Sequence, residues 1–129
     1  MLVLVVDDEV DIEMLFQQKF RRELKEGKFA FRFAHSGEEA LQFIESQGAA
    51  ELVLILSDIN MPGMTGIELL KKIKKIKNKN AEQKVFLVTA YGDDGSRQQA
   101  IANGADDFVN KPIDFEDLKK KMYLALGIA

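Results

Sequence analysis

Residues 55–66 read Ile55-Leu56-Ser57-Asp58-Ile59-Asn60-Met61-Pro62-Gly63-Met64-Thr65-Gly66, an apolar strand that ends on a carboxylate and then breaks into a turn. Three other apolar runs end on polar residues in the same manner: residues 2–6 on Asp7-Asp8-Glu9, residues 85–88 on Thr89, and residues 108–110 on Lys111. In an open parallel sheet, the carboxyl ends of the strands share one edge, and such folds place their sites there. We therefore expect acids, a hydroxyl and an ammonium to meet at one edge of a sheet.

Strands and helices alternate five times along the chain. The strands are expected over residues 2–6, 29–34, 52–56, 85–88 and 108–110. The helices, recognised by apolar residues three and four positions apart, are expected over residues 12–24, 36–44, 69–76, 96–103 and 114–126. This alternation implies parallel strands joined by right-handed helical crossovers. The sequence predicts an α/β fold with a doubly wound, five-stranded parallel sheet and five helices in a three-layer sandwich.

The composition is that of one soluble globular domain. The chain has 129 residues, of which 47% are hydrophobic and 30% charged, so disorder is not expected. A net charge of −3 argues against nucleic-acid binding as the main activity. The absence of cysteine excludes disulfides, thiolate metal sites and thiol catalysis. The apolar runs are too short to span a membrane and no secretory signal precedes them, which predicts a cytoplasmic protein without membrane contact.

The acids at the predicted edge imply a metal ion. Three carboxylates gathered there, Asp7, Asp8 and Asp58, repel one another unless a cation joins them. Each residue alone has an ordinary structural explanation: Asp58 is a common turn former, and Lys111 suits a solvated loop. The joint occurrence of this chemistry at four strand ends favours a functional site over those separate explanations.

Four motifs give the chain a specific resemblance: Val5–Glu9, Ser57–Gly66, Val88–Ala90 and Gly104–Pro112. In order and spacing they resemble those of the receiver domain of two-component response regulators, the fold named for the chemotaxis regulator. The resemblance covers residues 1–129 as one receiver domain. It implies the flavodoxin-like strand order 2-1-3-4-5 and a cis peptide bond between Lys111 and Pro112.

The resemblance also implies a role for each site residue. Asp58 would be the phospho-acceptor, Lys111 would pair with a phosphoryl oxygen, and Thr89 would hydrogen-bond another. Mg²⁺ would be held by Asp8, Asp58 and the backbone carbonyl of Asn60, with Asp7 acting through bound water. Phe108 would be the aromatic switch residue that moves inward when Thr89 shifts towards the phosphate.

The function implied by the resemblance is a phosphorylation-dependent signalling switch. A sensor histidine kinase or a phosphotransfer protein would donate the phosphoryl group, and an unknown output domain or protein would read the changed surface formed by the last two strand–helix units. The domain would catalyse only its own phosphorylation and dephosphorylation, so it is not expected to be an enzyme acting on an external substrate. It would not bind nucleic acid directly.

Two alternative functions belong to other classes. A Mg²⁺-dependent phosphohydrolase of the haloacid-dehalogenase type also uses a strand-end aspartate, but it needs an Asp-x-Asp pattern where this chain has Asp7-Asp8-Glu9. A phosphate-independent receiver-like interaction module would keep the fold without the chemistry, and the joint presence of the acids, Thr89 and Lys111 speaks against it. The sequence leaves open the output, the cognate kinase, the oligomeric state, and whether the chain stands alone or is part of a longer protein.

Two further residues have an open or ordinary interpretation. Tyr91, two residues beyond Thr89, could shield an aspartyl phosphate from water or could be a half-exposed loop residue. His35 follows the second predicted strand, and we interpret it as a loop histidine away from the acidic edge.

Overall fold

Five parallel strands form a single sheet in the order β2-β1-β3-β4-β5. The computed structural model describes residues 1–46, 49–76, 83–90 and 93–128. The strands are β1 (Leu2–Val6), β2 (Ala30–Ala34), β3 (Leu52–Asp58), β4 (Lys84–Ala90) and β5 (Asp107–Lys111). The predicted parallel sheet and its strand order are therefore confirmed.

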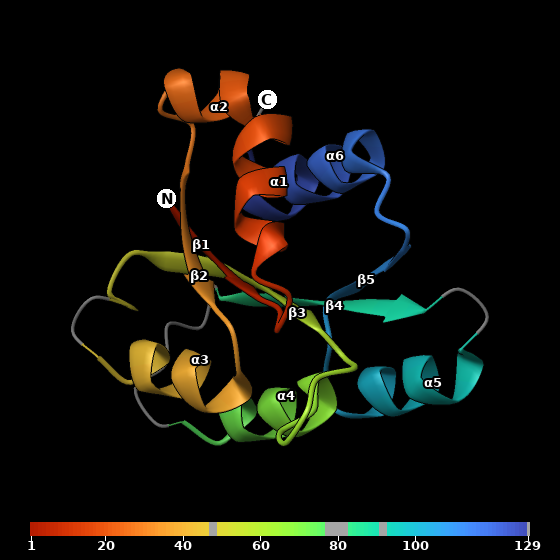
Figure 1. Cartoon of the computed structure of the whole chain (residues 1–129). Coiled ribbons are helices and arrows are strands. Elements are labelled where there is room, and N and C mark those ends of the chain that lie inside the picture. Colours follow the sequence, from red (N-terminus) through yellow and green to blue (C-terminus); the bar gives the residue numbers. More distant parts are fainter. Residues whose placement is uncertain (47–48, 77–82, 91–92, 129) are drawn as a thin grey trace.

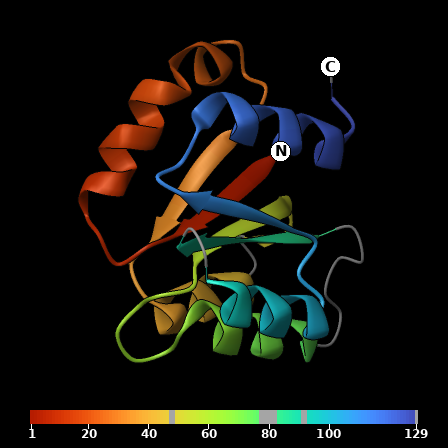
Figure 2. The ribbon, with the colours of Figure 1, turned by 90° about the vertical axis from the view of Figure 1, so that its right-hand side faces the viewer.

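Helices cover both faces of the sheet and complete a three-layer sandwich (Figure 1). One face carries α1 (Asp11–Lys19), α2 (Arg21–Lys25) and α6 (Phe115–Leu126), and the other carries α3 (Gly37–Ile44), α4 (Gly66–Lys74) and α5 (Asp94–Ala102). Figure 2 shows the sheet lying between these two layers. None of the helices in the described part of the chain combines the length and hydropathy needed to cross a lipid bilayer.

The described residues form six helices, so the prediction of five was wrong. The helix predicted over residues 12–24 is divided at Phe20, whose φ of −105° and ψ of 21° depart from helical values. The Phe20 ring is fully buried, stacks on Phe16 at 5.7 Å and meets Phe31 edge-on at 5.0 Å. Phe20 N–H still donates to the Phe16 carbonyl (2.9 Å), so the backbone keeps a helical hydrogen bond at the break. The helical spacing of the apolar residues therefore continues from α1 into α2. The sequence pattern therefore carries no sign of the interruption.

The sheet separates two hydrophobic clusters. Alternate residues of β1 point to opposite faces, so Leu4 and Val6 join one cluster while Val3 and Val5 join the other. The cluster under α3, α4 and α5 is mostly aliphatic, whereas the one under α1, α2 and α6 contains seven phenylalanines that are buried or packed against it: Phe16, Phe20, Phe29, Phe31, Phe33, Phe86 and Phe115. Every strand residue of β1 after Leu2 is buried, as expected for a sheet covered on both faces.

Three strands run further than predicted, and this fixes the site residues within the sheet. The predicted ends at residues 56, 88 and 110 fall short of β3, β4 and β5, which include Asp58, Thr89 and Lys111. The parallel ladder pairs Asp58 with Val88, Thr89 with Asn110, and Ala90 with Lys111. The polar residues thus continue the ladder at the carboxyl edge, where polarity alone had suggested an end.

Helix α5 begins earlier than the predicted Ser96. Asp93 caps it by accepting a hydrogen bond from the Ser96 backbone N–H (3.1 Å), which is the ordinary chemistry of a helix start. At its other end, Gly104 adopts a φ of +92°, the left-handed conformation that commonly follows the end of a helix and favours glycine. Tyr91 lies outside the described residues.

Candidate functional site

Asp7, Asp8 and Asp58 gather at the carboxyl ends of the neighbouring strands β1 and β3. One carboxylate oxygen from each lies within 4.8 Å of the others. Asp7 is 6% exposed and Asp58 is 3% exposed, while Asp8 is open to solvent. Three carboxylates at this spacing are hard oxygen donors of the kind that Mg²⁺ accepts, with water completing its octahedron. The donor set therefore fits Mg²⁺.

Lys111 brings a positive charge onto the buried carboxylate. Its Nζ donates to Oδ2 of Asp58 at 2.5 Å, although the lysine side chain is 36% exposed. Burial lowers the pKa of Lys111, but the hydrogen bond and the negative charge of Asp58 outweigh this, so the pKa is raised above its ordinary value. The ammonium is therefore held charged beside Asp58.

The turn after β3 supplies the other contact to Asp58. The Asn60 backbone N–H donates to Oδ1 of Asp58 (3.1 Å). The loop closes where Gly66 N–H donates to the Ile59 carbonyl (2.9 Å), and Gly63 supplies the turn with a φ of +73°. Both oxygens of Asp58 thus accept a hydrogen bond, and the Asn60 carbonyl stays a predicted metal ligand.

Asp7 is the member of the acidic cluster whose ionised form is disfavoured by its surroundings. Burial raises the pKa of its carboxyl, and the nearby charge of Asp58 raises it further. The Glu9 backbone N–H, which donates to Oδ1 of Asp7 at 2.9 Å, acts in the opposite direction without cancelling the increase. A cation bound among the three acids would remove this unfavourable energy.

Thr89 and Phe108 lie on the adjacent strands β4 and β5. Thr89 is 2% exposed, and its hydroxyl donates to Oδ1 of Asn110 at 3.3 Å. Phe108 is half-buried, with the Arg97 guanidinium 5.3 Å from the centre of its ring. The structure thus brings the three acids and Lys111 into one cluster, while the Thr89 hydroxyl is directed to Asn110.

Sequence reasoning misplaced His35 and did not select Asn110 or Arg97. The ring nitrogen Nδ1 of His35 lies 2.9 Å from the Asp7 carbonyl oxygen, so this histidine contacts the acidic edge and is not remote from it. The signal was available in the strand order: Val6 pairs with Ala34, so the residues that follow β1 and β2 must be neighbours. Asn110 and Arg97 carry no such signal, because their contacts depend on side-chain reach between β5 and α5.

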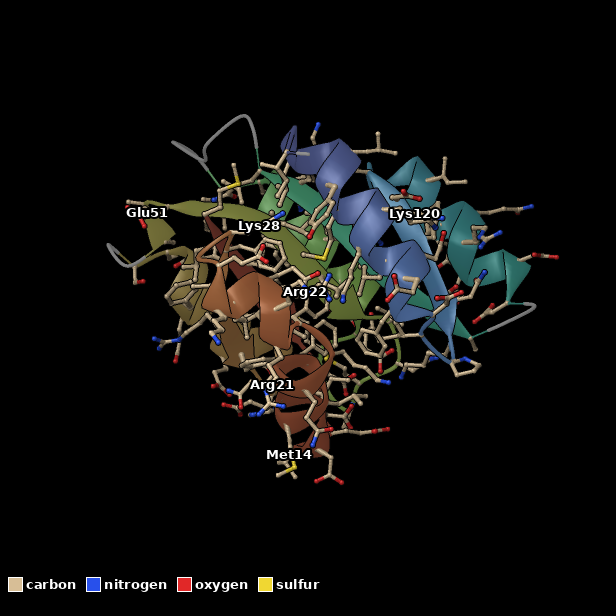
Figure 3. The ribbon with its side chains drawn as sticks, turned by 90° about the horizontal axis from the view of Figure 1, so that it is seen from above. Met14, Arg21, Arg22, Lys28, Glu51 and Lys120 are labelled. Carbon is tan, nitrogen blue, oxygen red and sulfur yellow. The ribbon has the colours of Figure 1, made fainter. Side chains whose placement is uncertain are left out.

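A hollow of about 850 Å³ lies away from this cluster, between α1, α2 and α6. Figure 3 looks onto this face, with Arg21 and Arg22 on α2 and Lys120 on α6. Seven lysines and arginines and three glutamates line it, among them the buried Glu23, which pairs with Lys119 at 3.2 Å. None of the predicted site residues belongs to its lining. The acidic cluster instead lies at the carboxyl ends of β1 and β3.

A comparison with protein families decides the assignment of the chain. The family described as "Response regulator receiver domain" matches residues 3–123. The chain belongs to the response-regulator receiver family. This excludes the haloacid-dehalogenase alternative and agrees with the fold and the order of the motifs. Receiver domains are signalling modules of two-component systems, which is the class predicted from the sequence.

Receiver domains from proteins of different length are similar to this one. It is 39% identical over 127 residues to a cyclic di-GMP phosphodiesterase of Thermotoga maritima, covering 98% of this chain and 31% of that protein. It is 34% identical over 126 residues to sporulation initiation phosphotransferase F of Bacillus subtilis, covering 96% of this chain and 94% of that protein. A receiver domain of Methanospirillum hungatei has a TM-score of 0.82 at 30% identity, with 98% and 93% of the two chains covered. The chain thus spans about a third of one relative and almost all of another.

Proposed function

We propose that this receiver accepts a phosphoryl group on Asp58, with Mg²⁺ as cofactor, and acts as a phosphorylation-dependent switch. One observation supports this above the others: the buried Asp58 carboxylate lies within 4.8 Å of two further acids and bonds directly to the Lys111 ammonium. The Asp58 carboxylate can serve as the nucleophile, and both a cation site and the fixed positive charge of Lys111 lie beside it. The donors would be a sensor histidine kinase or a phosphotransfer protein, and the reader an output domain or protein.

The chemistry follows from the placement of these charges. An Asp58 oxygen attacks the phosphorus of a phosphohistidine or a small acyl phosphate, forming the aspartyl P–O bond while the bond to the leaving group breaks. The transferred group carries its charge on the equatorial oxygens, and Lys111 can stabilise one of them. Bound Mg²⁺ would neutralise further charge on that group. Asn60 N–H holds the carboxylate in orientation, which is the positioning that such a transfer needs most.

The position of the acids at the carboxyl edge of the sheet, with Asp8 exposed, suits transfer between two proteins. A small substrate is usually enclosed in a cavity, whereas a carboxylate at an open sheet edge can be reached by a side chain of another protein. After transfer, the Thr89 hydroxyl would turn to a phosphoryl oxygen and Phe108 would follow it. The relay would therefore change the surface formed by α5, β5 and α6.

The proposal is tested by the Lys111→Ala variant. The fold is expected to persist because the side chain is partly exposed, but phosphorylation by acetyl phosphate should slow by about a hundredfold because one charge-stabilising donor is lost. Intact mass against time measures the rate, and circular dichroism checks the fold. Lys120→Ala, which removes an exposed lysine on α6, is the matched control. Equal rates in wild type and Lys111→Ala would contradict the assignment.

Metal binding separates the roles of the two acids after β1. Asp7→Ala is expected to weaken Mg²⁺ affinity by about tenfold, and Asp8→Ala by more, because Asp8 would ligate the ion directly and Asp7 through water. Calorimetric titration of Mg²⁺ measures both affinities, with Asp11→Ala as a control on α1. Equal losses would show that the roles are shared or reversed.

A further inference from the structure

The Thr89 hydroxyl can donate only one hydrogen bond at a time. That single hydrogen is directed to Oδ1 of Asn110 at 3.3 Å, and the threonine is 2% exposed. The same hydrogen is the one that a phosphoryl oxygen on Asp58 would require. The bond to Asn110 and the bond to a phosphoryl group therefore exclude each other.

Arg97 determines which end of the Asn110 amide faces Thr89. Its Nη2 donates to the same Oδ1 of Asn110 at 3.1 Å. A guanidinium has donors and no acceptor, so the amide must turn its oxygen, and not its NH₂ group, towards Arg97. That oxygen is then the atom offered to the Thr89 hydroxyl. Without Arg97, the amide can rotate by half a turn and present an N–H to Thr89, which leaves the hydroxyl hydrogen free.

Arg97 also touches the second switch residue. Its guanidinium lies 5.3 Å from the centre of the Phe108 ring, a cation–π contact. On the other side of β5, Nζ of Lys121 in α6 donates to the Phe108 carbonyl (2.6 Å). Arg97 is therefore the residue of α5 that contacts both Phe108 and the partner of Thr89.

We propose that Arg97 is a positioning residue that, through Asn110, holds the Thr89 hydroxyl away from the phosphoryl site in the unphosphorylated protein. The inference rests on the proposed function, because it assumes that phosphorylation draws the Thr89 hydroxyl to Asp58. Phosphorylation must then break the Thr89–Asn110 bond, and this cost is subtracted from the binding of the phosphoryl group. Arg97 thereby favours the resting conformation.

The experiment is a calorimetric titration with beryllofluoride and Mg²⁺, which mimic the aspartyl phosphate. Arg97→Ala is expected to bind the mimic about three- to tenfold more tightly than wild type, the change that corresponds to one ordinary hydrogen bond. Asn110→Ala should do the same by removing the acceptor itself. Arg97→Lys keeps a donor and should restore much of the wild-type affinity. Gln98→Ala, an exposed neighbour on α5, is the matched control and should bind like wild type.

A double-mutant cycle separates this role from a general effect on stability. In a Thr89→Val background the hydroxyl is absent, so adding Arg97→Ala should leave the affinity for beryllofluoride unchanged. An Arg97→Ala variant that binds as wild type or more weakly, or an effect that persists undiminished with Thr89→Val, would overturn the proposal. If wild type itself fails to bind beryllofluoride, the proposed function fails instead, so the two failures are distinguishable.

Discussion

The Asp58→Asn variant is expected to gain no phosphoryl group from acetyl phosphate and Mg²⁺, whereas the wild type gains one. The amide is neutral and a poor nucleophile, and it also removes the charge that attracts the Lys111 ammonium. Its size is almost that of the carboxylate, so the buried position can be kept. Intact mass after incubation measures the gain directly, and the expected loss is complete.

The control for this result is Asp94→Asn, an exposed acid in the first turn of α5. It should be phosphorylated at the wild-type rate, because it removes the same charge away from the cluster. Undiminished labelling of Asp58→Asn would refute the choice of Asp58 as acceptor. Labelling of neither protein would instead show that small phosphodonors do not serve this receiver.

Replacing Gly66 with alanine should destabilise the protein by about 1–3 kcal/mol, the usual cost of overpacking. Gly66 begins α4, and a Cβ there would fall against the backbone carbonyl oxygen of Asp58 and within 2.8 Å of the Ile59 Cα. These neighbours are main-chain atoms that cannot rotate away. Relief requires the turn after β3 to move, so phosphorylation at Asp58 should slow as well. Urea denaturation measures the free energy of unfolding.

Gly95 is the matched position for this test. It lies near the start of α5, and a Cβ added there meets no atom within 4 Å. Gly95→Ala should therefore raise the free energy of unfolding by about 0.5–1 kcal/mol, because alanine loses less backbone entropy in a helix. The same glycine-to-alanine substitution is thus expected to lower the free energy of unfolding at the start of α4 and to raise it at the start of α5. A Gly66→Ala variant as stable as wild type would show that the turn can adjust freely.

The sheet was predictable because its pattern is local and repeated. Apolar runs covered on both faces alternate with amphipathic helices, and each run ends in the polar residues of the site, as after Val6 and Leu56. The ends of β3, β4 and β5 were placed too early because a polar residue was taken as the end of a strand. In the structure Asp58, Thr89 and Lys111 still pair with the neighbouring strand.

The break at Phe20 and the contacts of Asn110 depend on packing between distant segments. Phe20 interrupts the predicted helix where its ring meets β2 and α6. The spacing of apolar residues along the helix predicts neither contact. Asn110 meets Arg97 because α5 lies beside β5, thirteen residues apart in sequence. The motifs located the acids and Lys111, but the contact of the Thr89 hydroxyl with Asn110 depends on side-chain positions that no motif encodes.

The helical layers on the two faces of the sheet differ in the apolar side chains that pack them against it. Under α1, α2 and α6, the Phe115 ring meets Phe16 and Phe20 edge to face at 5.3 and 6.1 Å, and Phe16 stacks on Phe20 at 5.7 Å. Helix α5, in contrast, buries only Ala100. Since local opening costs least where little apolar surface is lost, we expect α5 to open more readily than α1 and α6, which bury larger side chains. Substitutions in α5 can therefore change the surface offered to an output partner without disturbing the packing that positions the acids.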